Sequence, residues 1–477
     1  MIEDKQVVIN NFTLALRQKT ASIFIGAGLS AEIFNNRKWA ELVQPYADNI
    51  NLVNEQDFPF IAQAYVNSGN NLIEFKKEIG LSFISEKTTL VHLICAKLPI
   101  KNFWTTNYDC AIENALSQNN REYDLIYDNN SFVPKSNRTA VVYKCHGDCN
   151  NPESIVITTD DYESYSKSNP NFIAALLNEL ASNTILFLGY SFSDPDINNL
   201  LAKIKNENKN LTPHFFITRK ETDKNTAIKQ TLRLKQFEKY GIISLLIDEY
   251  TEIEVIIKEI YKQYMSYSVL ISGSASDYSY FGTEEQAKEL IYDIGYTLVK
   301  SDLDHGIKIV NGEGLGIGTP LKEGIADAVT ELGKDIADFW LPYPFSPKYY
   351  SQYEKQEPLE TQYREYRKKM IDQCGIVFFI FGNKKNAEGN IINADGVKKE
   401  FDIAVEKGKY VFPIGSTGYM AKELADLVVK DFEKYNGELP NIKAKYLEIC
   451  EQNVSNRKIL DNIFYIIDAL AFRSDAR

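Results

Sequence analysis

His146 is the residue best placed for proton transfer in this chain of 477 residues, which contains only four histidines. It lies in T-A-V-V-Y-K-C-H-G-D (139–148), where an apolar run over 140–143 predicts a short buried strand and Gly147 predicts a sharp turn. In open α/β sheets, ligands bind beyond the carboxyl ends of the strands, and an imidazole there suits a general base. The alternative is a histidine that only stabilises the loop.

Three other stretches place glycine and polar residues directly after an apolar run. They are G-A-G-L-S (26–30), T-T-N-Y-D (105–109) and G-Y-S-F-S-D (189–194). Because the carboxyl ends of parallel strands meet at one edge of a sheet, these residues are expected to gather near His146.

The first of these stretches predicts a nucleotide site. Gly26 and Gly28 allow backbone amides to approach an anion, and the helix that begins after the turn adds a favourable dipole. With Ala31 they satisfy the pattern G-x-G-x-x-G/A. No strand ending in Asp or Glu follows at the distance that a dehydrogenase requires, so the pattern favours nucleotide binding over hydride transfer.

The rest of the chain predicts two α/β domains in tandem. In the first half, a helix over 6–19 and a helical region over about 38–98 alternate with apolar strands, which include 214–219 and 243–248. After a helix that ends near residue 265 the pattern restarts. The further strands are expected in 268–276, 307–311, 335–342, 375–383 and 409–415, and a closing helix in 458–472. The predicted fold class is therefore α/β, with two Rossmann-like, doubly wound domains over 1–265 and 266–477.

Composition narrows the functional classes. Lys and Arg total 53 and Asp and Glu total 65, so the net charge of −12 argues against non-specific nucleic-acid binding. No apolar run is long enough for a bilayer, and the amino terminus does not resemble a secretory signal. The six cysteines form no C-x-x-C pair, so no metal site is expected. These features predict a cytoplasmic protein with reduced thiols and no membrane partner.

The four motifs of the first half, taken in order, resemble those of the sirtuin superfamily of NAD enzymes. The resemblance implies that NAD binds across the carboxyl edge of the sheet as a substrate, with Asn107 at the nicotinamide ribose and His146 as the catalytic base. The NAD-binding residues that it implies are Gly26, Ala27, Ser30, Asn107, Asp109, Gly189 and Ser191. Asp109 or Asp148 would orient the loop, or each would only cap a turn or a helix.

This chain also departs from the deacetylating sirtuins. They carry a four-cysteine zinc module soon after the histidine motif, whereas here only Cys145 and Cys149 lie nearby. They usually continue G-I-P-D-F-R after the glycine turn, whereas this chain has A-E-I-F-N-N-R-K-W over 31–39, and Thr106 stands where Gln is usual. Deacylation is therefore not expected, and cleavage of the nicotinamide–ribose bond is.

The second half resembles a SLOG domain, a nucleotide-ligand sensor. The motifs that carry the resemblance are I-S-G-S-A-S (271–276), N-G-E-G-L-G-I-G (311–318) and G-V-K-K-E-F-D-I-A (396–404). Backbone amides of the glycine loops would bind phosphates, and basic side chains would pair with a pyrophosphate. The expected ligand-binding residues are Gly273, Ser274, Gly314, Gly316, Arg367, Lys385 and Glu400, with Arg364 as an alternative to Arg367.

The combination of the two domains resembles the NADase effectors of the Thoeris anti-phage defence system. It implies that a cyclic ADP-ribose isomer, made by a partner with a TIR domain, binds the SLOG domain and switches on NAD hydrolysis. A homotetramer or filament is the expected assembly. Three alternatives remain: a non-catalytic NAD or ADP-ribose sensor, a nucleotide phosphoribohydrolase with Glu400 as its acid, and a deacetylase.

Overall fold

The computed structural model describes residues 3–35, 39–52, 54–132, 138–192, 199–203, 205, 212–300, 307–343 and 359–472. The chain divides into two compact units, Met1–Tyr261 and Lys262–Arg477. The division falls inside helix α12 (Glu252–Met265).

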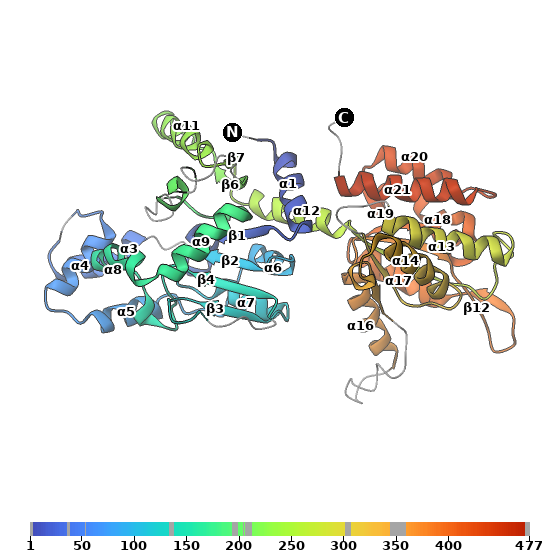
Figure 1. Cartoon of the computed structure of the whole chain (residues 1–477), viewed down its shortest axis with the longest axis horizontal. Helices are drawn as coiled ribbons and strands as arrows, with labels where there is room; N and C mark the ends of the chain where they lie inside the picture. Colours follow the sequence, from blue (N-terminus) through green and yellow to red (C-terminus); the bar gives the residue numbers. More distant parts are fainter. Residues whose placement is uncertain are drawn as a thin grey trace. The chain divides into compact units, whose positions relative to one another are not determined.

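The first unit is built on a seven-stranded sheet in which every pairing is parallel (Figure 1). In sheet order its strands are β3 (Tyr123–Ile126), β4 (Ala140–Lys144), β2 (Asn102–Thr105), β1 (Ala21–Ile25), β5 (Thr184–Leu188), β6 (His214–Arg219) and β7 (Ile242–Ile247). From β1 the chain continues to β2 on one side of the sheet and reaches β5 on the other. This reversal is a topological switch point, the usual place for a ligand in an open α/β sheet.

The predicted helical regions of the first unit are confirmed. The helix expected over 6–19 is α1, and Asp4 caps its start by accepting a hydrogen bond from the N–H of Gln6. The region expected over 38–98 consists of four separate helices. The helices of this unit with bounds inside the described residues are α1 (Lys5–Arg17), α2 (Ala27–Ser30), the 3₁₀ turn η1 (Ala31–Phe34), α3 (Trp39–Asn49), α4 (Phe58–Asn67), α5 (Leu72–Leu81), α6 (Leu90–Lys97), α7 (Ala111–Gln118), η2 (Pro152–Ser154), α8 (Thr159–Ser168), α9 (Pro170–Ser182), α11 (Lys224–Glu238) and α12.

The second unit has a five-stranded parallel sheet and a separate β-hairpin. In sheet order the strands are β10 (Trp340–Pro342), β9 (Lys308–Asn311), β8 (Ser268–Ser274), β11 (Ile376–Phe381) and β14 (Tyr410–Pro413), and the hairpin is β12 (Asn383–Lys385) with β13 (Ile391–Asn393). Counted along the chain this order is 3-2-1-4-5, which is the arrangement of a Rossmann-type sheet. The predicted fold class is therefore confirmed for both units.

One predicted strand of the second unit is mostly a turn. Residues 335–342 were expected to be extended, but Asp335 caps the 3₁₀ turn η3 (Ile336–Asp338), and only β10 is strand. A carboxylate that binds a nearby N–H competes with the strand ladder. The remaining helices are α13 (Glu284–Lys300), α14 (Gly318–Leu332), α16 (Leu359–Asp372), α17 (Asp395–Glu406), η4 (Gly415–Thr417), α18 (Tyr419–Lys430), α19 (Phe432–Asn436), α20 (Pro440–Glu448) and α21 (Asn456–Phe472).

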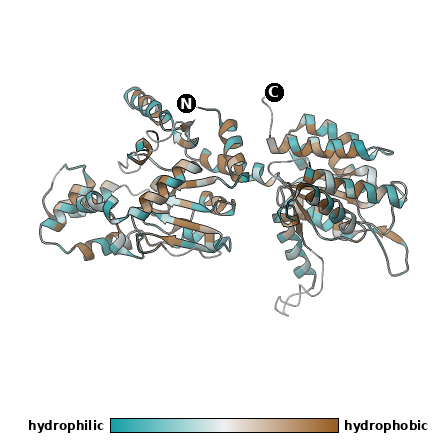
Figure 2. Ribbon diagram, viewed as in Figure 1, coloured by the Kyte–Doolittle hydropathy of each residue, from teal (hydrophilic) through white to brown (hydrophobic). Residues whose placement is uncertain are grey.

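Burial explains why these strands form the core. The strands of both sheets are predominantly apolar, whereas the helices mix apolar and polar residues (Figure 2). Every residue of β1, β5 and β11 is buried, as expected for parallel strands covered on both faces. Among the helices of the described ranges, none combines the length and the apolar character needed to cross a bilayer.

Candidate active site

The turns after β2 and β4 hold the two residues predicted to be catalytic. Thr105 pairs in parallel register with Lys144, and the N–H of Cys145 donates to the carbonyl oxygen of Thr105 at 2.8 Å. Asn107 and His146 each lie two residues beyond this pair, at neighbouring carboxyl ends of strands that are about 4.8 Å apart. Their exposed fractions are 9% and 7%. The structure therefore brings both residues to the same edge of the sheet.

Hydrogen bonds join the Asn107 turn to the turn after β1. The side-chain Nδ2 of Asn107 lies 3.4 Å from Oγ of Ser30, and its backbone N–H donates to Oγ1 of Thr105 at 2.9 Å. The same Thr105 hydroxyl donates to the carbonyl oxygen of Ile25 at 2.7 Å. The first two motifs thus form one connected surface at the carboxyl edge.

The glycine turn after β1 packs directly against the turn after β5. The N–H groups of Gly26 and Gly28 donate to the carbonyl oxygens of Leu188 and Gly189 at 2.8 and 2.9 Å. A Cβ atom on Gly189 would lie 2.4 Å from the backbone nitrogen of Leu29. The N–H groups of Gly26 and Gly28 are therefore paired within the protein, so an anion at this turn would be bound by other amides of the turn. The glycines permit the close contact of two turns.

Replacing Gly189 with alanine is expected to reduce the free energy of unfolding of the first unit by about 2–3 kcal/mol, since φ is +61° and the new methyl group meets backbone. Chemical denaturation measures this loss. Gly333→Ala is the matched control, because Gly333 has a φ of +63° but no atom within 4 Å of its Cβ position. It should lose only about 1 kcal/mol. Equal losses in the two variants would contradict the close contact.

The position of His146 depends on the glycine that follows it. Gly147 has a φ of +91°, and a Cβ atom there would lie 2.2 Å from the carbonyl oxygen of Ser154. The imidazole contacts two rings of α8 edge to face, with centroid separations of 5.4 Å to Tyr162 and 6.0 Å to Tyr165. These packed rings limit the orientations of the imidazole.

A buried lysine links the turn after β2 to the turn after β4. Lys144 has no exposed surface, and its Nζ donates to Glu113 Oε1 at 2.9 Å and to Asp148 Oδ2 at 2.5 Å. The carbonyl oxygens of Tyr108 and Asp109 lie 2.9 and 2.6 Å from the same Nζ, so its three N–H groups are shared among four acceptors. One ammonium therefore binds the turn that carries Asn107 and the turn that carries His146.

The charges of Lys144, Glu113 and Asp148 stabilise one another. Burial alone would lower the pKa of Lys144, but the carboxylates of Glu113 and Asp148 raise it well above its ordinary value. Burial raises the pKa of Glu113, and the nearby ammonium opposes that change. Sequence reasoning considered Asp148 but missed Lys144 and Glu113. A charged residue at the end of an otherwise apolar run was the available signal.

The other predicted NAD-binding residues occupy the same edge in different ways. Ala27 is the exposed first residue of α2, and Ser191 is exposed just beyond β5. Asp109 Oδ1 accepts a hydrogen bond from the N–H of Ala111 at 3.0 Å, so its carboxylate supports the start of α7. The last residues of the fourth motif, Ser193 and Asp194, lie outside the described residues.

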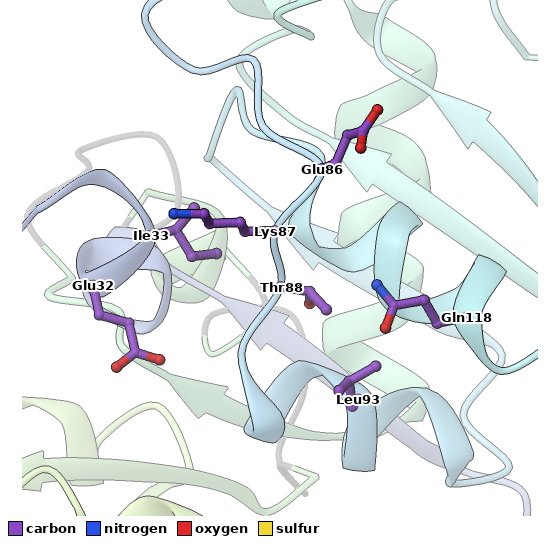
Figure 3. Close-up of a pocket in the computed structure, with 7 residues that line it drawn as sticks. All are labelled: Glu32, Ile33, Glu86, Lys87, Thr88, Leu93 and Gln118. Atoms are coloured by element: carbon purple, nitrogen blue, oxygen red, sulfur yellow. The ribbon is translucent and has the colours of Figure 1, made fainter.

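A surface pocket of about 460 Å³ opens beside the turn that follows Ser30 (Figure 3). Its lining comes from η1, the segment before α6, α6 itself and α7. The lining residues are Glu32, Ile33, Glu86, Lys87, Thr88, Leu93 and Gln118. None of the predicted catalytic residues is among them. The pocket lining includes no imidazole.

The second unit gathers three polar side chains at its own sheet. Ser272 Oγ donates to Glu400 Oε2 at 2.7 Å, and Arg367 Nε lies 3.6 Å from Glu400 Oε1. Burial raises the pKa of Glu400, while the hydrogen bond from Ser272 and the charge of Arg367 oppose the rise. Glu400 and Arg367 were predicted, whereas Ser272 was missed.

The glycine loop after β9 packs on the end of β8. A Cβ atom on Gly314 would lie 2.1 Å from the carbonyl oxygen of Gly273, and one on Gly316 would lie 2.2 Å from that of Ala275. The N–H of Ala275 donates to the carbonyl oxygen of Leu315 at 2.7 Å. These contacts bring the predicted phosphate-binding glycines together at the switch point of this sheet.

Asn383 is a fully buried residue that sequence reasoning missed. Its Oδ1 accepts from the N–H groups of Ser276 and Asp277 at 2.8 and 2.9 Å, and its Nδ2 donates to the Asp277 carbonyl oxygen. The hydroxyl of Ser274 donates to the backbone carbonyl of Asn383 at 3.0 Å. Asn383 thus determines the shape of the loop after β8.

Two predicted basic residues differ from Arg367 in their surroundings. Lys385 is exposed on β12. Arg364 pairs with Glu406 at 2.8 Å on the surface, where both side chains are more than half exposed. Of the two arginines, Arg367 pairs with the buried Glu400 and Arg364 with a surface carboxylate. Lys385 stays a predicted ligand-binding residue.

Two family models match this chain in the order predicted. A SIR2-like domain matches residues 101–245, and the Sir2- and TIR-associating SLOG family matches residues 252–470. A shorter similarity covers about half of the chain: Defense-associated sirtuin 2 of Bacillus subtilis is 24% identical over 48% of this chain and 24% of its own length.

Two curated relatives match almost from end to end. NAD(+) hydrolase ThsA of Cytobacillus dafuensis is 34% identical over 98% of this chain and 97% of its own length. NAD(+) hydrolase ThsA of Bacillus cereus is 33% identical, and the match covers 98% of each chain. Because the similarity extends through both units at this level of identity, the chain belongs to the ThsA family.

Proposed function

We propose that this protein is an NAD+ glycohydrolase whose first unit releases nicotinamide and ADP-ribose. The observation that carries the proposal is the register of β2 and β4, which supports a joint action of Asn107 and His146. The full-length relatives are named NAD(+) hydrolases, which agrees with this chemistry. The test is incubation of the purified chain with NAD+ and chromatography of the products.

The reaction requires little covalent chemistry from the protein. The bond between ribose C1′ and nicotinamide breaks, its electron pair moves to the ring nitrogen, and water attacks the oxocarbenium-like carbon. Asn107 holds the ribose hydroxyls and orients the water. Neutral His146 accepts the proton that the water loses. The turn over 26–30 lies along the pyrophosphate, and the turn that begins at Gly189 lies on the adenosine side.

The second unit is the regulatory part of the proposal. A cyclic ADP-ribose isomer, made by a TIR-domain partner, binds at the end of β8 and raises the rate of NAD+ hydrolysis. The glycine loop offers backbone groups to phosphates, Arg367 offers a charge, and Glu400 offers acceptors for ribose hydroxyls. We place the catalytic domain at 1–265 and the sensor domain at 266–477.

Arg367→Ala is expected to increase the concentration of cyclic ADP-ribose isomer needed for half-maximal activation by at least about tenfold. The loss of one charge-assisted contact with a phosphate is worth about 1.5–3 kcal/mol. Nicotinamide release from the full-length chain, titrated with a panel of isomers, measures it. Arg364→Ala is the matched control, since its side chain pairs with Glu406 on the surface. Equal shifts in both variants would remove Arg367 from the proposed site.

The cellular role follows from the same chemistry. Depletion of NAD+ in an infected cell would limit phage replication, so we assign the protein to Thoeris-type defence in the cytoplasm. Ligand energy acts only through a difference in affinity between two states, so activation should favour an active homotetramer or filament. Light scattering with and without the activating isomer tests this assembly.

A further inference from the structure

Two cysteines face each other across the turns that carry the proposed catalytic residues. Cys110 Sγ and Cys149 Sγ are 3.5 Å apart. Cys110 lies three residues after Asn107, and Cys149 lies three residues after His146. The N–H of Cys149 also donates to the carbonyl oxygen of Tyr108 at 3.0 Å, which keeps the two segments adjacent.

The two thiols have different surroundings. Cys149 is buried, whereas Cys110 is half-buried at the start of α7, where Asn150 Nδ2 lies 3.1 Å from its sulfur. The hydrogen bond from Cys149 and the charge of Lys144 lower the pKa of Cys110. The same bond raises the pKa of Cys149. Cys110 is therefore the more readily ionised of the two thiols, and the thiolate is the form that reacts with oxidants.

The cysteines elsewhere in the chain offer a contrast. Burial raises the pKa of Cys95 and of Cys374 to about 12 and that of Cys450 to about 11. Apolar burial makes a thiol inert. Among these four thiols, an oxidant should therefore react first at Cys110.

The same thiols lie close to the carboxylate of Asp148, so a metal ion is the rival occupant. Ligand atoms of Cys110, Asp148 and Cys149 lie within 4.8 Å of one another. Both carboxylate oxygens of Asp148 already have partners: Lys144 binds Oδ2 at 2.5 Å, and the N–H of Asn150 donates to Oδ1 at 2.9 Å. A cation there would lie beside the ammonium of Lys144. It would have only three ligands, whereas a closed zinc site has four. Chemistry between the thiols is favoured.

We propose that Cys110 and Cys149 form a reversible disulfide that inhibits the enzyme when peroxide accumulates. The Cys110 thiolate attacks one oxygen of the peroxide, the O–O bond breaks, and Cys110 becomes a sulfenic acid while hydroxide leaves. The sulfur of Cys149 then attacks the sulfenic sulfur. The S–S bond forms, the S–O bond breaks, and the proton of Cys149 leaves with that oxygen as water. The cysteines lose two electrons, and the peroxide gains them.

Inhibition follows because the Cys110–Cys149 disulfide would join the two turns that carry the proposed catalytic residues. This part of the inference depends on the proposed function. The two sulfurs must approach from 3.5 Å to about 2.05 Å, which pulls on both turns. A displacement of about 1 Å in a catalytic group costs about a hundredfold in rate. Asn107 and His146 precede the cysteines on short, buried turns, so they move with them.

The test uses the full-length protein and hydrogen peroxide, followed by alkylation, digestion without reductant and mass spectrometry. A linked pair of peptides containing Cys110 and Cys149 is expected, together with at least a tenfold loss of nicotinamide release that dithiothreitol restores. Cys149→Ser should form no intramolecular link. Relative to its own untreated activity, it should show a smaller dithiothreitol-reversible loss of nicotinamide release after peroxide than the unsubstituted protein. Cys450→Ser, the matched control, should behave as the unsubstituted protein, because Cys450 is not part of the pair.

Three results would overturn the proposal. Separate alkylation of Cys110 and Cys149 after peroxide treatment would exclude the disulfide, and so would one zinc ion per chain whose removal by a chelator is needed before oxidation. A linked peptide pair with unchanged nicotinamide release would exclude inhibition. Absence of NAD+ cleavage in the reduced protein would refute the proposed function alone, since the cross-link is measured independently of activity.

Discussion

Replacing His146 with alanine is expected to lower the rate of nicotinamide release by about 10²–10⁴-fold, the usual contribution of a general base. The same range is expected for Asn107→Ala, since the loss of orientation is costly when the attacking water must be aligned with the ribose. Single-turnover assays at saturating NAD+ and activating ligand measure the rate of cleavage. Circular dichroism checks that the first unit keeps its fold.

His214→Asn is the matched control for this prediction. His214 is also a buried histidine of the first sheet, but it is the first residue of β6 and thus lies at the amino edge, away from the predicted catalytic turns. Its Nδ1 accepts a hydrogen bond from the N–H of Ile185 at 3.3 Å. The control should alter stability more than turnover. Full turnover by the His146 variant would remove the proposed base.

The largest effect on stability is expected at Lys144. Lys144→Met keeps an unbranched apolar stem of four heavy atoms but leaves Asp148 and Glu113 buried without a cation. Breaking a buried pair in this way costs about 3–5 kcal/mol. Because the pKa of Lys144 is raised, its ammonium persists throughout the neutral range, so the whole loss should appear at pH 7. Calorimetry of the full chain measures the shift.

Lys77→Met is the control for the buried pair. Lys77 pairs with Glu74 at 3.3 Å on an exposed helix face, where such a pair contributes at most about 1 kcal/mol. If Lys144→Met costs no more than this control, the buried network does not stabilise the turns. Adding Glu113→Gln to Lys144→Met should recover part of the loss, since it removes one of the two unpaired carboxylates.

The fold was largely predictable because its strands are short apolar runs that end in glycine or polar residues. The range 214–219 was expected to be a strand and is β6. The prediction of a strand over all of 335–342 was wrong, because the apolar pattern did not reveal that Asp335 caps a turn. The strand β3 was missed, since only one of its four residues is buried and its pattern is weak.

Site residues were predictable where one segment shows an apolar strand followed by a polar residue. They were not predictable where hydrogen-bond or ion-pair partners come from distant segments. His146 and Asn107 each follow a recognisable strand, so their place at one edge follows from the fold. Lys144 and Glu113 are 31 residues apart, and no periodicity connects them. The hydrogen bonds of the Gly26 and Gly28 amides were also hidden, because their acceptors are at the end of β5 and in the turn that follows it.

The complete burial of Lys144 also determines how the protein responds to dissolved salt. Salt screens charges that water can reach, over a Debye length of about 8 Å at 0.15 M and about 3 Å at 1 M. Exposed pairs such as Lys300 with Glu331 weaken as salt rises. The pair of Lys144 with Asp148 has no exposed surface, so counterions cannot approach it. We therefore expect the ion pair that holds the turn of His146 to change little with ionic strength, while exposed pairs weaken.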